Sequence, residues 1–174
     1  MLKNVLFCFS LILSSAFSLN CNGVSSTVLS EIKEKTDFRF MLPISNEWKV
    51  EVKYPYPLDL SKTISMVRLH YFDSNENYVV GIEQHRVSGY KITREETIID
   101  VKNNEERTAK VEEYFTPIQR GELVYLNGIE ARFESWANTN KGGILRWIND
   151  GTYLEMDSSR LTKTEMIDLA KSMK

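Results

Sequence analysis

The residue types best suited to catalysis or metal binding are few in this sequence. It contains two histidines, His70 and His85, and two cysteines, Cys8 and Cys21. The histidines fall on two neighbouring predicted strands, in a register that separates them by about four residues at roughly 3.4 Å each. They therefore cannot share one metal ion, and we interpret both as exposed strand residues. No H-E-x-x-H, G-x-S-x-G, paired-cysteine or phosphate-binding glycine pattern occurs.

Acidic residues are plentiful, but their spacing picks out no pair with separate acid and base roles. No candidate nucleophile has a visible base beside it. We therefore expect a protein that is not an enzyme and that uses no cofactor and no metal. A hydrolase is the less favoured alternative, and it would need a cleft with perturbed titratable groups.

Aromatic and guanidinium side chains are the stronger candidates for binding. In the stretch LRWINDGTYLEM, a two-residue Asp-Gly turn places Trp147 on an apolar strand face, so we interpret Trp147 as core. Tyr153 falls on the opposite face, where half-buried packing with its hydroxyl in water is expected. Trp136 shares a face with charged residues and is expected to be exposed or stacked on Arg146. The candidate ligand or partner contacts are therefore Trp136, Arg146 and Tyr153.

The composition indicates one ordinary folded domain. The chain has 174 residues, of which 42% are hydrophobic and 26% charged, and its formal net charge is -2. That length suffices for a single hydrophobic core without metal or disulfide. A near-neutral charge supplies no basic surface for nucleic acid, so no nucleic-acid partner is expected.

The N-terminus has the pattern of a secretory signal. Lys3 is the only charge in residues 1–20, and an apolar run too short to span a bilayer extends from Val5 to Leu19. Cys21 follows directly, as in bacterial lipoprotein signals, where this cysteine is linked to diacylglycerol. We therefore predict lipidation of Cys21. The alternative is ordinary cleavage after Ser18, which would leave Cys21 as a free thiol in a secreted protein.

The mature chain reads as a β-rich domain between two helices. Apolar residues recur at helical spacing over Val24–Thr36, and a capping box at Thr162 and Glu165 begins a C-terminal helix. Alternating residues predict strands at Trp48–Tyr54, Ile64–Phe72 and Tyr78–Arg86, and the highly charged segment 93–113 is expected to be an exposed hairpin or loop. Asn127-Gly128 and Asp150-Gly151 predict two further hairpins with type I′ turns.

The predicted registers follow from keeping apolar residues on one face. Pairing Asp73 with Tyr78 sets Arg68 opposite Glu83 and groups the apolar residues of both strands. The Asn-Gly turn pairs Val124 with Ala131. The Asp-Gly turn pairs Trp147 with Leu154, and on the other face it sets Arg146 opposite Glu155 as a cross-strand ion pair.

Several blocks together resemble a family. These are FRFMLPISNEWKVEVKYPYP, MVRLHYFD, VYLNGIEARF, GGILRWINDGTYLEM and LTKTEMIDLAKSM, which cover most of the chain from Phe38 to Met173. They are similar to a domain of unknown function found in envelope lipoproteins, and in the outer portions of anti-sigma-factor-like membrane proteins, of Gram-positive spore-forming bacteria. The resemblance implies a curved antiparallel sheet with packed helices, like half-barrel domains of the lipoprotein-carrier and stress-sensor type. The family has no established activity to carry over to this chain.

These inferences combine into one expectation. The fold class is α+β, a curved antiparallel β-sheet of about six to eight strands with an N-terminal and a C-terminal helix packed on it. Residues 1–20 are the signal peptide, 21–36 a tether and short helix, and 37–174 a single β-rich domain. We expect a non-catalytic module that binds an unknown protein or wall component and is anchored by lipid to the outer face of the cytoplasmic membrane.

The alternative function is a carrier. In that interpretation the concave sheet holds a lipid or other apolar ligand, and the cavity lining consists of Phe133, Leu145, Trp147 and Met156.

Overall fold

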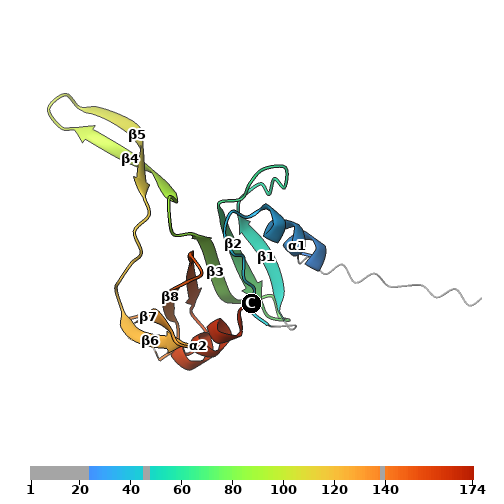
Figure 1. Cartoon of the computed structure of the whole chain (residues 1–174). Helices are drawn as coiled ribbons and strands as arrows, with labels where there is room; N and C mark the ends of the chain where they lie inside the picture. The colour runs from blue at the N-terminus through green and yellow to red at the C-terminus, as the bar shows by residue number, and fades with distance from the viewer. Residues whose placement is uncertain (1–23, 45–47, 138–139) are drawn as a thin grey trace, which may run out of the picture.

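The computed structural model describes residues 24–44, 48–137 and 140–174. The predicted signal peptide and Cys21 lie outside the described residues. The α+β prediction is confirmed: seven antiparallel strands form one sheet in the order β1-β2-β3-β9-β8-β7-β6, and β4 and β5 form a separate two-stranded sheet (Figure 1). The number of strands in the main sheet lies within the predicted six to eight.

The elements lie close to the predicted segments. The helices are α1 (Ser26–Lys35) and α2 (Lys163–Ser172). The strands are β1 (Lys49–Tyr54), β2 (Met66–Phe72), β3 (Tyr78–Arg86), β4 (Lys91–Asp100), β5 (Glu105–Tyr114), β6 (Glu122–Leu126), β7 (Ile129–Ser135), β8 (Gly143–Asn149) and β9 (Thr152–Ser158). No helix in the described part of the chain is long and apolar enough to cross a lipid bilayer.

One face of the sheet, here called the inner face, carries the core. Ile32 of α1 and Met166 of α2 are fully buried against it, so both helices cover this face. The inner-face residues in the core are Val67, Leu69, Tyr71, Val80, Ile82, Val124, Leu126, Ala131, Phe133, Leu145, Trp147, Leu154 and Met156. Trp147 is 5% exposed, which confirms its interpretation as a core residue.

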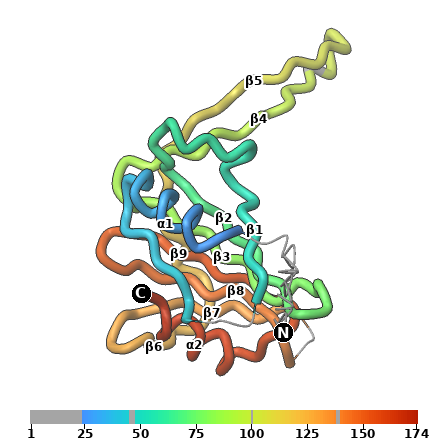
Figure 2. Tube along the Cα trace, turned by 90° about the vertical axis from the view of Figure 1, so that its right-hand side faces the viewer, coloured from blue at the N-terminus to red at the C-terminus, as the bar shows by residue number. Residues whose placement is uncertain are grey.

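Backbone pairing closes the domain around this core. The segment after α1 runs beside the C-terminus, where the N–H of Leu42 donates to the carbonyl of Lys174 at 3.0 Å and the reciprocal bond is 3.1 Å (Figure 2). At the start of α2, the side chains and backbone of Thr162 and Glu165 make the predicted capping box. The helix therefore begins where the sequence indicated.

Both predicted two-residue turns are present. Asn127 and Gly128 have φ of 50° and 90°, and Asp150 and Gly151 have 47° and 75°, so each pair supplies the two positive φ angles of a type I′ turn. Glycine meets this requirement without a steric cost from Cβ. The registers follow, with Val124 paired to Ala131 and Arg146 paired to Glu155.

The register between β2 and β3 is correct except at its end. Arg68 pairs with Glu83 as predicted, but Tyr78 pairs with Phe72 and not with Asp73, because a bulge shifts the register there. The carboxylate of Asp73 accepts the backbone N–H groups of Asn75 and Asn77, each at 2.9 Å, and so belongs to the connecting turn. The prediction missed this local side-chain hydrogen bonding.

Candidate functional site

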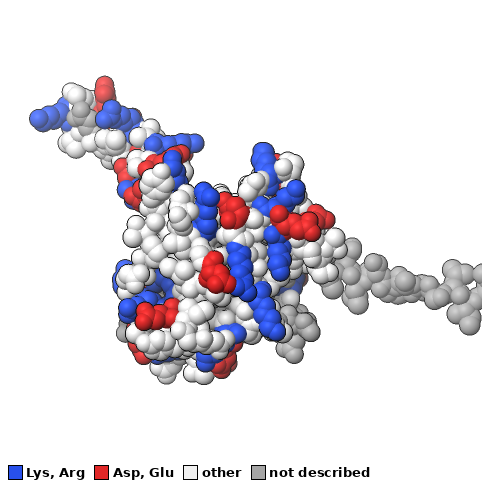
Figure 3. All heavy atoms as spheres, in the orientation of Figure 1, with Lys and Arg blue, Asp and Glu red and all other residues white. Residues whose placement is uncertain are grey.

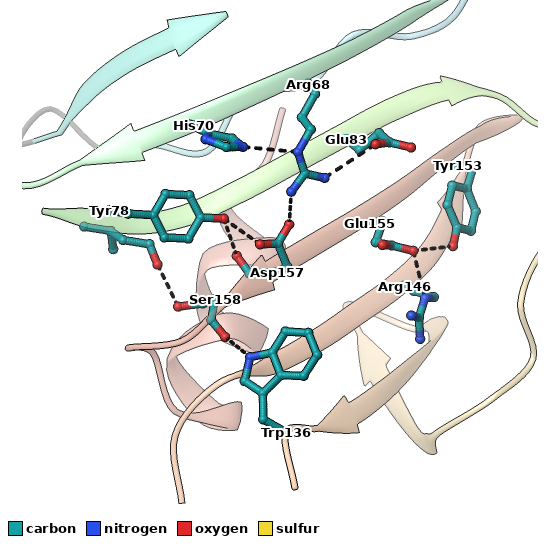
Figure 4. A network of polar contacts seen from close by, with 11 residues as sticks. Arg68, His70, Tyr78, Glu83, Trp136, Arg146, Tyr153, Glu155, Asp157 and Ser158 are labelled. Atoms are coloured by element: carbon teal, nitrogen blue, oxygen red, sulfur yellow. Dashed lines mark hydrogen bonds and ion pairs between the residues drawn. The ribbon is translucent and has the colours of Figure 1, made fainter. Parts of the chain in front are cut away.

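The face of the sheet opposite the helices, here called the outer face, carries two groups of charged residues. The first is centred on Arg68 of β2, whose guanidinium pairs with Asp157 and with Glu83 at 3.4 Å (Figure 4). Its Nε donates to His70 Nε2 at 3.1 Å, and the Tyr78 hydroxyl donates to Asp157. The guanidinium of Arg68 is therefore bound by carboxylates of both β3 and β9.

The second group is centred on Arg146 of β8, whose side chain is only 4% exposed. Its Nη1 donates to Glu134 and its Nε to Glu155, both at 2.8 Å. The Tyr153 hydroxyl donates to the same Glu155 oxygen at 3.0 Å. The hydrogen bond from Arg146, joined by the charge of Arg120, lowers the pKa of Glu134, while burial and the charge of Glu155 raise the pKa of Tyr153.

Two carboxylates face each other where these groups meet. Glu83 and Glu155 are directly opposite on β3 and β9, and burial raises the pKa of Glu83 although Arg68 opposes that shift. Each carboxylate already accepts hydrogen bonds from its own arginine. Both carboxylates therefore have a structural partner within the sheet.

The structure corrects the interpretation of both histidines as exposed. His85 is 1% exposed, stacked on Tyr90 with ring centroids 3.9 Å apart and flanked by Phe115 and Tyr153 at 4.4 and 5.1 Å. His70 is partly buried beside the Tyr78 ring at 5.0 Å. Burial is the largest cause that lowers the pKa of each histidine. Phe115 and Tyr153, which are distant from His85 in sequence, cover its ring, and strand alternation cannot indicate such contacts.

The three predicted contact residues are only partly brought together. Arg146 and Tyr153 share Glu155, but Tyr153 is 3% exposed, so its predicted half-burial with a hydroxyl in water was wrong. Phe115 covers its ring at 4.6 Å. Trp136 does not stack on Arg146. It is 40% exposed, and its Nε1 donates to the Ser158 carbonyl at 2.7 Å (Figure 4), which fixes the end of β7 to the end of β9.

A cavity lies beside Arg146 and Tyr153. Residues 115–121, here called the strap, lead from the end of β5 to β6 at the far edge of the sheet (Figure 1). The strap and the outer face enclose a half-open cavity of about 270 Å³. It is lined by Pro117, Ile118, Gln119, Ile129, Glu130, Ala131, Arg132, Arg146, Trp147, Ile148 and Tyr153. This cavity was not predicted, because the strap has no periodic pattern in the sequence.

A second candidate surface is the β4–β5 hairpin, residues 91–114, here called the arm. The prediction of an exposed hairpin over 93–113 is confirmed, and the arm projects well away from the main sheet (Figure 1). Every side chain of β4 and β5 whose burial is described is exposed, except the partly buried Glu96, Ala109 and Val111. Near its tip, Ile98, Ile99 and Val101 are 40%, 66% and 86% exposed.

The surface charges are mixed. Basic and acidic side chains alternate along the arm and over the face of the body that is in view (Figure 3). The described residues contain no group of three His, Cys, Asp or Glu side chains placed to hold a metal ion.

Comparisons with known proteins identify no similar protein. No protein-family model, curated protein or solved structure matches the chain. The resemblance to the envelope lipoprotein family stays a prediction.

Proposed function

We propose that this protein is a non-catalytic binding module, anchored by lipid at Cys21 outside the cytoplasmic membrane, that engages a partner protein through the arm. The observation that carries the proposal is the projection of the arm with apolar side chains exposed near its tip. Each strand of the arm has ten residues, so the arm extends by roughly 33 Å at about 3.3 Å per residue.

The low stability and the exposed surfaces of the arm favour binding to a partner. A two-stranded ribbon by itself is marginally stable in water, and its two edges present unpaired backbone groups to other chains. Ile98, Ile99 and Val101 add an exposed apolar surface at the end of this ribbon. A partner that covers the tip removes this apolar surface from water, which stabilises the complex. The same contact restricts the motion of the arm.

The charge of the arm points to a protein partner. Residues 91–114 contain seven acidic and five basic side chains. A segment with net negative charge is repelled by anionic lipid headgroups, which attract clusters of lysine and arginine. Mixed charges around an apolar centre are common at protein interfaces.

The proposed anchor is compatible with this use of the arm. Only Asn22 and Gly23 separate Cys21 from Val24, whose N–H donates to the Val50 carbonyl of β1 at 2.8 Å. A lipid on Cys21 would hold the β1 and α1 side of the domain close to the membrane. The arm leaves the opposite side of the body (Figure 1) and would point away from that surface.

The core supports a binding module over a carrier. The four side chains that would line a carrier cavity are Phe133, Leu145, Trp147 and Met156. They are between 0% and 7% exposed and belong to one packed cluster that includes Met166 of α2. A filled core of this kind favours external binding surfaces.

Site-specific photo-crosslinking in producing cells tests the role of the arm. A photoreactive side chain at Ile99, 66% exposed, is compared with one at Tyr125 of β6, 57% exposed. We expect a discrete protein adduct from position 99 only, and we expect Val101→Asp to remove it while the melting temperature is unchanged. Equal adducts from both positions, or none from position 99, would refute the proposal.

Metabolic labelling with palmitate tests the anchor separately. The wild-type protein is expected to incorporate label and to sediment with membranes, and Cys21→Ser is expected to lose both properties. An unlabelled wild-type protein would exclude the lipid anchor and leave the secreted form.

A further inference from the structure

The cavity beneath the strap contains a positive charge that the fold does not neutralise. Arg132 of β7 and Arg146 of β8 are directly opposite each other on the outer face. Like charges in this position repel. Arg146 is balanced by Glu134 and Glu155, but Arg132 has no hydrogen-bond or ion-pair partner within the described residues. Arg132 lines the cavity and is partly buried there.

Within the described residues, an exposed negative charge without a partner also lines this cavity. Glu130 precedes Arg132 by two residues on β7, so the two side chains point to the same face. Glu130 also lines the cavity and, in the described part of the chain, pairs with neither Arg132 nor any other residue. The Cα atoms of two such residues lie roughly 6.8 Å apart at about 3.4 Å per residue. Both side chains are long enough to reach opposite ends of one small molecule.

Part of the remaining wall of the cavity is apolar. Pro117 and Ile118 of the strap face Ile148 of β8, and Ile118 and Ile148 keep 41% and 39% of their surface exposed. A volume of about 270 Å³ is just below the range of about 300–1,000 Å³ found for pockets of drug-sized ligands. The ligand that fits is therefore small and partly apolar.

We propose that this cavity binds a small zwitterion with an apolar side chain, of which a free apolar amino acid is the simplest case. Arg132 pairs with the carboxylate, for which a guanidinium offers two parallel donors. Glu130 accepts the ammonium group. The apolar side chain packs against Pro117, Ile118 and Ile148 and displaces water from them.

This assignment does not depend on the proposed role of the arm, because no residue of β4 or β5 lines the cavity. If the arm binds no partner, ligand binding in the cavity can still be measured, and the reverse also holds. The strap joins the two sites in sequence, but each has its own test.

Isothermal titration of the full-length protein with L-leucine tests the proposal. Leucine has nine non-hydrogen atoms, and we expect saturable binding with a Kd of about 0.1–1 mM. Two analogues remove one charge each: 4-methylpentanoate lacks the ammonium group and 3-methylbutylamine lacks the carboxylate. Each is expected to bind roughly tenfold more weakly than leucine. Binding of either analogue as tightly as leucine would overturn the zwitterion assignment.

Three variants identify the site. Arg132→Gln and Glu130→Gln are each expected to weaken leucine binding roughly tenfold, whereas Arg107→Gln on the arm is expected to leave it unchanged. Arg132→Gln also removes the repulsion with Arg146, so its melting temperature is expected to equal or exceed that of the wild type. Weak binding by this variant is therefore not a result of unfolding. No saturable binding to the wild type, or full binding by Arg132→Gln, would refute the proposal.

Discussion

Replacement of Arg146 by methionine tests whether the buried charge group stabilises the sheet. The Arg146 side chain is 4% exposed, and it donates to Glu134 and Glu155 at 2.8 Å. Methionine is flexible and uncharged, so Arg146→Met leaves the Glu134 and Glu155 carboxylates without their common partner. The exposed fractions of Glu134 and Glu155 are 31% and 24%.

The expected loss follows from these exposures. Removal of one member of a fully buried ion pair costs about 3–5 kcal/mol. Water reaches part of both carboxylates and screens the charge that remains, so we expect a smaller loss of about 2–3 kcal/mol in the free energy of unfolding. For a domain of this size the melting temperature should fall by roughly 5–10 °C.

Urea denaturation at pH 7 measures this loss, and Arg120→Met is the matched control. Arg120 also pairs with Glu134, at 3.2 Å, but its side chain is 70% exposed. We expect the control to change the free energy of unfolding by no more than about 0.5 kcal/mol. Equal effects of Arg146→Met and Arg120→Met would show that burial of Arg146 adds nothing, and the reasoning would fail.

The difference in stability between the wild type and Arg146→Met is expected to depend on pH. Arg146 lowers the pKa of Glu134 in the folded protein. The resulting stability is present above the unfolded pKa of about 4.3 and is lost as the pH falls through the folded value. The difference between wild type and Arg146→Met should therefore shrink below about pH 4. A difference that grows in acid would contradict the assigned ion pair.

Three further predictions concern the polar groups of His85, Tyr153 and Trp136. Burial lowers the pKa of His85 below its usual value, so the melting temperature of the wild type should fall as the pH decreases below about 6.5. In His85→Phe the melting temperature should fall less steeply. Equal slopes of melting temperature against pH in differential scanning calorimetry would contradict this. Tyr153→Phe removes the hydrogen bond to Glu155 and should cost about 0.5–1.5 kcal/mol in urea denaturation, with no loss refuting the bond. Trp136→Phe removes the bond to the Ser158 carbonyl and should cost about 1 kcal/mol, measured in the same way; an unchanged midpoint would show that the bond contributes nothing.

The local sequence determined most of the strand pattern. Alternation of apolar and polar residues has the same period as a strand, so it indicated which face of β2, β3, β8 and β9 would be buried. The turns at Asn127-Gly128 and Asp150-Gly151 then fixed two registers, because few residues tolerate two successive positive φ angles. The pairing of Arg146 with Glu155 followed from these two facts.

The candidate sites were predicted only in part. Arg146 and Tyr153 were named from their place on the outer face, and the structure brings them to one cavity. Arg132 lies opposite Arg146, and this position depends on the connection between β7 and β8, which has no two-residue turn to set a register. The role proposed for Glu130 depends on the same pairing.

Burial of the outer face was decided by tertiary structure. His85 and Tyr153 lie on a strand face that alternation marks as polar, and both are buried because Phe115, at the start of the strap, packs on them. The strap has neither helical nor strand periodicity, so its path across the sheet cannot be read from its residues. Sequence alone therefore determined the strands and their turns, because these depend on neighbouring residues. Only the tertiary structure decided the cavity and the covered rings, because these depend on contacts between distant segments.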